Sequence, residues 1–157
     1  MSEQPQTVFS IEKIYLKDLS LEIPNAPQIF TEQEQPQVDI KLHNEVRAMD
    51  SDIYEVVLTA TVTAKHKEKT AFLVEVAQAG LFLIRNYPQQ ELSMIINVTC
   101  PRTLLPYARE TVAGVLGRAG FPPVTLPHVG FETIYQQRLQ EAQQQQQQQQ
   151  GGVTPAH

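Results

Sequence analysis

The fold is decided by residues 53–84, which contain IYEVVLTATVTA (53–64), the charged segment KHKEK (65–69) and TAFLVEVAQAGLFLI (70–84). Successive side chains of a strand lie on opposite faces, so alternating apolar residues mark a buried face. In the first run this face consists of Tyr54, Val56, Leu58, Ala60 and Val62. Two such runs joined by a short charged tip predict a long antiparallel hairpin.

The second run carries apolar residues on both of its faces. Phe72, Val74 and Val76 form the face expected in the core, whereas the other face has one carboxylate among apolar residues, namely Ala71, Leu73, Glu75, Ala77 and Ala79. A half-buried strand normally shows polar residues to the outside. The pattern therefore predicts an outward surface that another polypeptide covers.

Two further strands are expected before the hairpin. In residues 8–23 the apolar residues Phe9, Ile11, Tyr15, Leu19, Leu21 and Ile23 alternate with polar ones, and residues 37–43 alternate again. Pro24 and Pro27 end the first strand because proline lacks an amide hydrogen and restricts the residue before it. Residues 28–36 are a long connection, and residues 44–51 are expected to be a loop.

After Pro88 the periodicity becomes helical. Residues 91–98 suggest a short helix, residues 103–119 a firm helix that Gly120 ends, and residues 131–143 a second helix, with a break expected at Cys100 and Pro101. Four strands followed by two helices predict an α+β fold, a four-stranded antiparallel sheet with both helices on one face. We expect a flexible segment 1–7, one domain 8–142 and a disordered glutamine-rich tail 143–157.

Composition limits the possible functions. The chain has 157 residues, a net charge of −5 and one cysteine. An acidic balance argues against nucleic-acid binding, and no apolar run is suited to a signal peptide or to membrane insertion. A single cysteine fits a reducing compartment, so a cytoplasmic location is expected.

Motifs for catalysis are weak. The four histidines show no metal-ligand spacing, and no phosphate-binding or dinucleotide motif occurs, so no metal or cofactor is expected. Cys100 precedes the firm helix, where a thiol can be activated, although an inert thiol is the preferred interpretation. An enzyme for a small ligand that uses Cys100 or His128 stays open as an alternative, as does an assembly scaffold.

Gly114 and Gly117 lie inside the firm helix, where each glycine costs about 1 kcal/mol relative to alanine. Either the helix tolerates this lower helix propensity because it packs on the sheet, or the glycines allow another subunit to approach the helix closely. Asp18 and Glu22 share one strand face and, with Glu75, suggest either a solvated surface or a binding surface in which charge selects the partner.

Five short runs together resemble SecB, the family of bacterial protein-export chaperones. They are PNAP (24–27), DIYEVVL (52–58), TAFL (70–73), LPYARE (105–110) and GFP (120–122). They occur in the family's order within residues 8–139. The resemblance implies a homotetramer, a dimer of dimers, that holds unfolded preproteins and delivers them to the SecA motor ATPase. It implies no enzymatic activity.

The resemblance also implies three sets of site residues. The SecA-binding surface maps onto Asp18, Glu22, Leu73 and Glu75. A client groove between the long connection and the second helix maps onto Ile23, Ile29, Phe30, Phe131 and Tyr135. An interface between dimers maps onto Val112, Gly114, Leu116 and Gly117. This chain departs from the family in lacking an aromatic residue at 33–35 and in its nearly uncharged tail.

Overall fold

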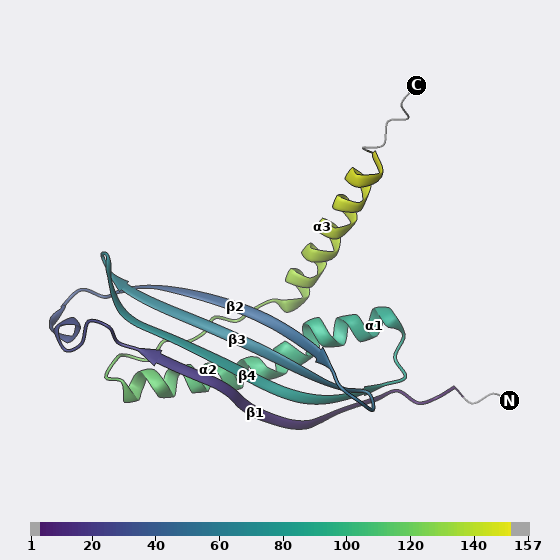
Figure 1. Cartoon of the computed structure of the whole chain (residues 1–157), viewed down its shortest axis with the longest axis horizontal. Helices are drawn as coiled ribbons and strands as arrows, with labels where there is room; N and C mark the ends of the chain where they lie inside the picture. Colours follow the sequence, from purple (N-terminus) through teal and green to yellow (C-terminus); the bar gives the residue numbers. More distant parts are fainter. Residues whose placement is uncertain (1–3, 152–157) are drawn as a thin grey trace.

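The computed structural model describes residues 4–151, which form one four-stranded antiparallel sheet and the helices that follow it (Figure 1). The strands are β1 (Val8–Glu22), β2 (Gln37–Ala48), β3 (Ile53–His66) and β4 (Lys69–Arg85), in the order β1-β4-β3-β2. The β3–β4 hairpin occupies the centre of the sheet. The predicted α+β fold and its hairpin are confirmed.

Strand β2 is longer than predicted. Residues 44–48 were expected in a loop, but they pair with β3 as far as Ala48 opposite Tyr54, and the chain turns at Ser51 and Asp52, both with positive φ. Main-chain pairing does not require apolar side chains. Because β2 is an edge strand with one side in solvent, its polar residues cost little there.

The predicted helix break at Cys100 and Pro101 is wrong. Helix α1 (Gln89–Met94), the π-helical turn η2 (Ile95–Thr99) and α2 (Cys100–Arg118) follow one another without an interruption. In η2 the Cys100 amide donates to the Ile95 carbonyl, and the corresponding donor for Ile96 would be Pro101, which has none. The Asn44 side-chain amide of β2 instead donates to the Ile96 carbonyl at 3.5 Å.

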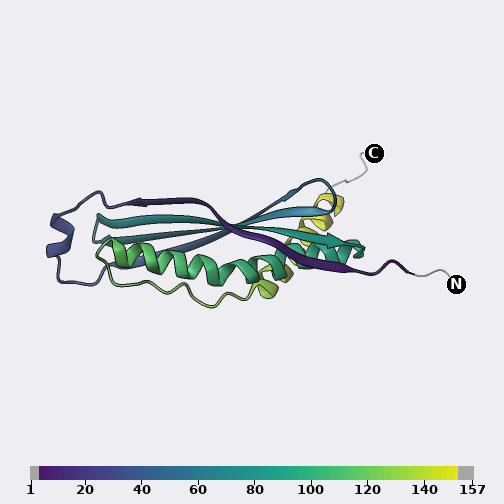
Figure 2. The ribbon, with the colours of Figure 1, turned by 90° about the horizontal axis from the view of Figure 1, so that it is seen from below.

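Helix α2 runs along one face of the sheet, which we term the inner face (Figure 2). Its buried stripe packs against inner-face residues of β3 and β4 and consists of Leu104, Ala108, Val112 and Leu116. Phe72, Val74 and Val76 are buried in the same core, as predicted. Full burial of such a side chain contributes about 1.5–3 kcal/mol, so this layer supplies much of the stability.

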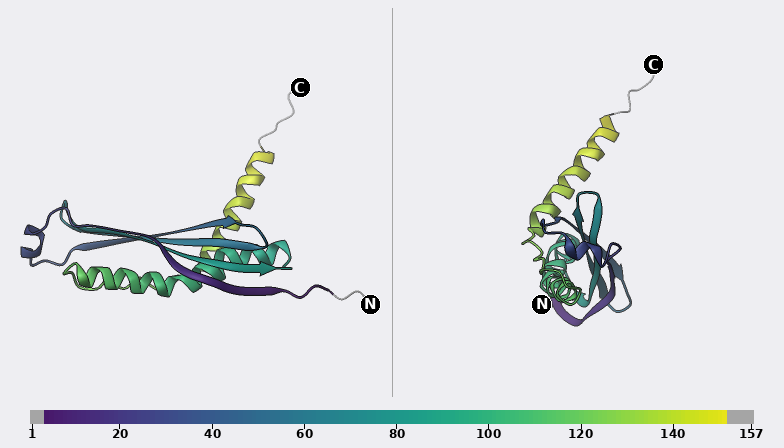
Figure 3. Two further views of the ribbon diagram at one scale, coloured as in Figure 1. Left: turned by 60° about the horizontal axis from the view of Figure 1, so that its bottom comes forward. Right: turned by 90° about the vertical axis from the view of Figure 1, so that its left-hand side faces the viewer.

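Helix α3 (Phe131–Gly151) touches the body only at its start and then stands away from the sheet (Figures 1 and 3). It extends past the predicted end at residue 143, so the disorder expected for residues 143–151 is a wrong prediction. Glutamine is a good helix former, and no helix breaker occurs before Gly151. The remaining predicted tail, 152–157, and residues 1–3 lie outside the described part. Within residues 4–151 no helix has both the length and the apolar character to span a membrane.

Two bulges in β1 change which side chains share a face. Glu12 and Lys17 have no partner in the register with β4. After each of these two residues, the odd-numbered and even-numbered side chains of β1 exchange faces of the sheet. Tyr15, predicted to face the core with Phe9 and Leu19, therefore lies on the opposite, outer face, opposite Ala79. Strict alternation was the wrong assumption for this strand.

Two alanines of β4 are also buried, contrary to their predicted outward exposure. Ala71 is left without a partner by an irregularity between β3 and β4 and joins the core. Ala79 stays on the outer face but is fully covered. Neither alanine therefore contributes to the exposed apolar surface of β4, which is smaller than predicted.

Candidate functional site

The outer face of the sheet brings together the four residues predicted to bind SecA. Opposite one another lie Asp18 and Ala77, Ser20 and Glu75, and Glu22 and Leu73. We term Asp18, Glu22, Leu73 and Glu75 the acidic face. Figure 2 shows that α2 lies on the other side of the sheet, and in the described part of the chain no helix covers this one.

One carboxylate near the acidic face was missed from the sequence. Asp39 of β2 lies opposite Thr63, which in turn lies opposite Leu73, so it belongs to the same row across the sheet as Glu22. Glu75 itself is exposed and accepts a hydrogen bond from Thr61 Oγ1 at 3.2 Å. No local sequence signal marks Asp39, because only the strand order and register place it there.

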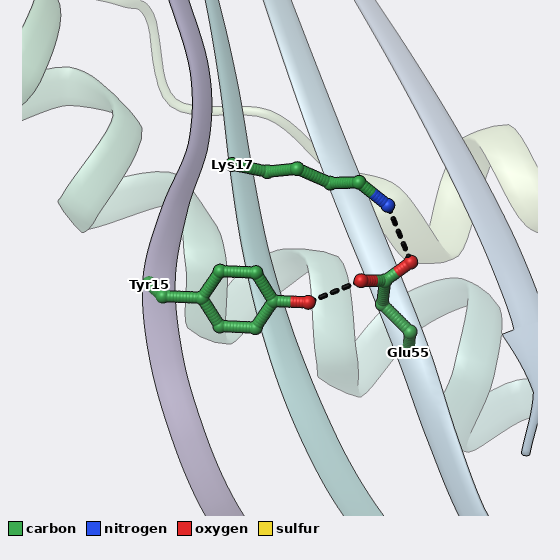
Figure 4. A network of polar contacts seen from close by, with 3 residues as sticks. All are labelled: Tyr15, Lys17 and Glu55. Atoms are coloured by element: carbon green, nitrogen blue, oxygen red, sulfur yellow. Dashed lines mark hydrogen bonds and ion pairs between the residues drawn. The ribbon is translucent and has the colours of Figure 1, made fainter.

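Beside the acidic face, Tyr15 and Lys17 of β1 both reach across β4 to Glu55 of β3 (Figure 4). Lys17 Nζ donates to Glu55 Oε1 at 2.7 Å, and the Tyr15 hydroxyl donates to Oε2. Ala79, directly opposite Tyr15, carries only a methyl group, which leaves room for the ring to cross. The hydrogen bonds from Lys17, the larger cause, and from Tyr15 lower the pKa of Glu55. Burial, the larger cause, and the hydrogen bond to Glu55 raise the pKa of Tyr15 to about 12.

This network predicts a loss of stability at both extremes of pH. Because the folded state lowers the pKa of Glu55, its contribution is present above about 4.5 and is lost as the pH falls through the folded value. Because the folded state raises the pKa of Tyr15, its contribution is lost as the pH rises from about 10 to about 12. Urea unfolding across pH should show a shallower alkaline loss in Tyr15→Phe and a shallower acid loss in Glu55→Gln. Profiles parallel to that of the parent protein would contradict this account.

At the end of the sheet, the long connection and the segment after α2 enclose an open groove of about 470 Å³. Its apolar lining includes Ile29, Phe30, Phe72 and Phe121, and its rim carries polar residues such as Glu32, Glu34 and His66. The ring of Phe121 contacts both other rings, with centroid distances of 5.0 Å to Phe30 and 4.8 Å to Phe72. Such aromatic contacts favour defined, offset geometries.

Gly120 has a positive φ of 89° that ends α2 and turns the chain back toward Phe30. A Cβ at this position would lie 3.3 Å from the Phe30 ring, so a side chain here would both strain the backbone and press on the groove wall. The sequence GFP at 120–122 was the available signal for this wall, because it places an aromatic residue directly after a helix stop.

Only some of the residues predicted for the client groove lie in the groove of the structure. Ile29 and Phe30 line the groove, whereas Ile23 is half-buried beside the core and is not part of the lining. Phe131 is buried in the core, and the Tyr135 hydroxyl donates to Ser93 Oγ at 2.8 Å beside α1. Helix α3 is therefore not the groove wall that was predicted.

The reason lies in the path of residues 121–130, which run back alongside α2 before α3 begins (Figure 2). Arg109 Nε of α2 donates to the Leu126 carbonyl at 3.1 Å, which holds this segment along the helix. Helix α3 consequently starts near η2, well away from the end of the sheet that holds the groove (Figure 1).

The residues predicted for the oligomer interface lie on two opposite sides of α2. Val112 and Leu116 are fully buried against the sheet of their own chain, so they leave no surface for another subunit. Gly114 and Gly117 lie on the opposite side of α2, where an added Cβ would meet no described atom within 4 Å apart from its chain neighbours and the backbone of its own helix. The proposed interface is thereby restricted to the glycine side of α2.

The residues considered for catalysis do not form a reactive site. Cys100 is fully buried, and this burial raises the pKa of its thiol to about 12, so the thiolate nucleophile is unavailable near neutral pH. His128 lies exposed in the segment between α2 and α3. Within residues 4–151, no three side chains of the types that bind metals come together.

Comparison with known proteins identifies the family. Residues 2–142 match the family described as preprotein translocase subunit SecB. The protein-export protein SecB of Dechloromonas aromatica is 58% identical over 141 residues, covering 90% of this chain and 93% of that protein. The SecB of Methylobacillus flagellatus is 57% identical over 140 residues and 89% of each chain.

A solved structure shares the fold. The SecB-like chaperone of Mycobacterium tuberculosis, in complex with a peptide from an antitoxin, superposes with a TM-score of 0.65 at 21% identity, covering 77% of this chain and 90% of that one. Together with the family match over nearly the whole domain, this likeness agrees with the sheet and helix arrangement described above. The chain belongs to the SecB family of protein-export chaperones, which are not enzymes.

Proposed function

We propose that this protein is an ATP-independent holdase of the cytoplasm that binds unfolded preproteins, keeps them competent for translocation and delivers them to SecA. The observation that carries the proposal is the open apolar groove in a chain of the export-chaperone family. The M. tuberculosis relative, which was solved with a bound peptide, supports peptide binding as the activity.

The groove suits extended segments of varied sequence. Phe30 is 48% exposed and packs against Phe121 on one side, so part of its ring is available to a bound segment. An apolar surface on a long connection adapts to unrelated apolar side chains better than a rigid pocket does. Each contact is weak, and several grooves of one assembly acting on one client raise the overall affinity through effective concentration.

The acidic face is assigned to SecA. Its carboxylates are solvent-exposed and lie on the sheet face opposite α2, whereas Phe72 of the groove lies on the α2 face. A negative surface with a half-buried leucine favours a partner segment that is positively charged and partly apolar. Separate surfaces would allow client and SecA to be held at the same time, which delivery requires.

A homotetramer, a dimer of dimers, is part of the same proposal. Strand β1 is an edge strand whose inner-face apolar residues extend past the cover of α2, leaving Ile11, Leu16, Leu19 and Leu21 exposed. Gly114 and Gly117 leave the adjacent helix surface low enough for close approach of another backbone. An uncovered edge and a flat helix side support self-association.

Light scattering with a slow-folding precursor tests this function. Scattering of the purified protein alone should give the mass of four chains. Addition of a denatured precursor without ATP should show suppressed aggregation at one tetramer per precursor. Unchanged aggregation at a stoichiometric ratio would reject the holdase proposal, and a monomeric mass would reject the assembly.

A further inference from the structure

One buried polar side chain of β4 lies on the inner face, next to Ala77, the residue that pairs with Asp18 of the acidic face. Gln78 of β4 is only 4% exposed and is the one buried polar residue among those that the structure describes. Its Nε2 donates to the main-chain carbonyl of Tyr15 at 3.1 Å. A buried amide without a partner costs about 1–3 kcal/mol, so this bond accounts for a polar group in an otherwise apolar layer.

The bond lies at the second bulge of β1. Leu16 pairs with Gln78 and Asp18 pairs with Ala77, which leaves Lys17 as the unpaired extra residue. A bulge disrupts the regular ladder, and a side chain can then supply the missing hydrogen bond. Gln78 binds the Tyr15 carbonyl from the inner side of the sheet, while Glu55 binds Lys17 and Tyr15 on the outer side.

The position of this bulge decides where the acids of β1 point. With Lys17 unpaired, Asp18, Ser20 and Glu22 lie opposite Ala77, Glu75 and Leu73 on the outer face. If Lys17 paired as an ordinary ladder member, every later side chain would change faces. Leu19 and Leu21 would then face outward, and the acids would turn toward the side of α2.

We infer that Gln78 is a positioning residue for partner recognition: by holding the Lys17 bulge through the Tyr15 carbonyl, it keeps Asp18 and Glu22 on the same face as Glu75. The inference rests on the proposed role of the acidic face in binding SecA. Gln78 touches neither the client nor the partner, and it acts only through the register of β1.

Disulfide trapping measures this register directly. Ser20→Cys and Glu75→Cys would place thiols on directly opposed residues, a separation close to that of a disulfide. The native Cys100 is buried and can be left in place. The cross-link is expected to form readily in this background and at least about five times more slowly once Gln78→Met is added.

Deletion of Lys17 provides the decisive rescue. A β1 strand that lacks Lys17 needs no bulge and keeps Asp18 opposite Ala77, so the deletion should restore cross-linking in the Gln78→Met background. With Ser20 and Glu75 native, SecA affinity should fall at least about tenfold in Gln78→Met and recover in the double variant. Gln90→Met, on the exposed surface of α1, is the control and should change neither quantity.

The outcomes are separable. Unchanged cross-linking in Gln78→Met would overturn the inference. A loss of cross-linking that deletion of Lys17 does not restore would also overturn it, because removing the bulge cannot repair a defect in core packing. If Gln78→Met does not fold, recovery of folding by the deletion supports the inference and continued misfolding overturns it. If the parent protein fails to bind SecA, the proposed function fails, whereas the cross-linking result still decides the role of Gln78.

Discussion

Replacement of Phe30 by aspartate is expected to lower the affinity for unfolded preproteins by about 10- to 100-fold, the loss that corresponds to about 1.5–3 kcal/mol of apolar burial. Phe30 lines the groove and contacts Phe121 at a centroid distance of 5.0 Å. Because the side chain is 48% exposed, the change should cost little folding stability. Fluorescence anisotropy of a labelled, unfolded precursor measures the effect.

Leu139→Asp is the matched control for this variant. Leu139 lies on α3, is 46% exposed and accepts the same change from an apolar to a charged side chain. Since α3 does not border the groove, this variant should bind clients like the parent protein. Equal losses in both variants would place the clients along α3 as well, and unimpaired binding by Phe30→Asp would remove the groove from the proposed function.

Glu75→Lys is expected to weaken SecA binding by at least about tenfold and to leave client binding unchanged. The substitution puts a positive charge in the middle of the acidic face, where Glu75 is exposed and lies opposite Ser20. Juxtaposed like charges cost several kcal/mol at an interface, and the remaining binding should depend less on salt. Titration calorimetry at two ionic strengths measures both quantities.

Glu45→Lys separates position from net charge. Glu45 is exposed on the same outer face, on β2 opposite Val57. Its replacement by lysine changes the net charge of the protein by the same amount as Glu75→Lys does. Its SecA affinity should stay close to that of the parent protein. An equal loss in the two variants would show that only overall charge matters, and loss of client binding in Glu75→Lys would show that the acidic face has a structural role.

The two candidate surfaces differ in how far the sequence could predict them. Leu73 and Glu75 were placed on the outer face by alternation alone, and the structure confirms that placement, because β4 alternates regularly between Phe72 and Val76. Ile29 and Phe30 line one groove in the structure, whereas Phe131 and Tyr135, predicted for the same groove, lie outside its lining. The path of residues 121–130 along α2 depends on contacts such as that of Arg109 with Leu126. No local pattern in residues 121–130 encodes such a contact.

Local periodicity by itself determined the number of strands along the chain, the central hairpin, the apolar face of β4 and the stop at Gly120, since each depends on neighbours within a few residues. Only the tertiary structure decided the bulges at Glu12 and Lys17, the outward position of Tyr15, the alignment of Asp39 with Glu22, and the continuous helix through Pro101. Bulges and strand register are selected by partners such as Gln78 and Glu55, which lie 63 and 40 residues away from Tyr15 along the chain. A hydrogen bond between residues so far apart exists only once the sheet has formed.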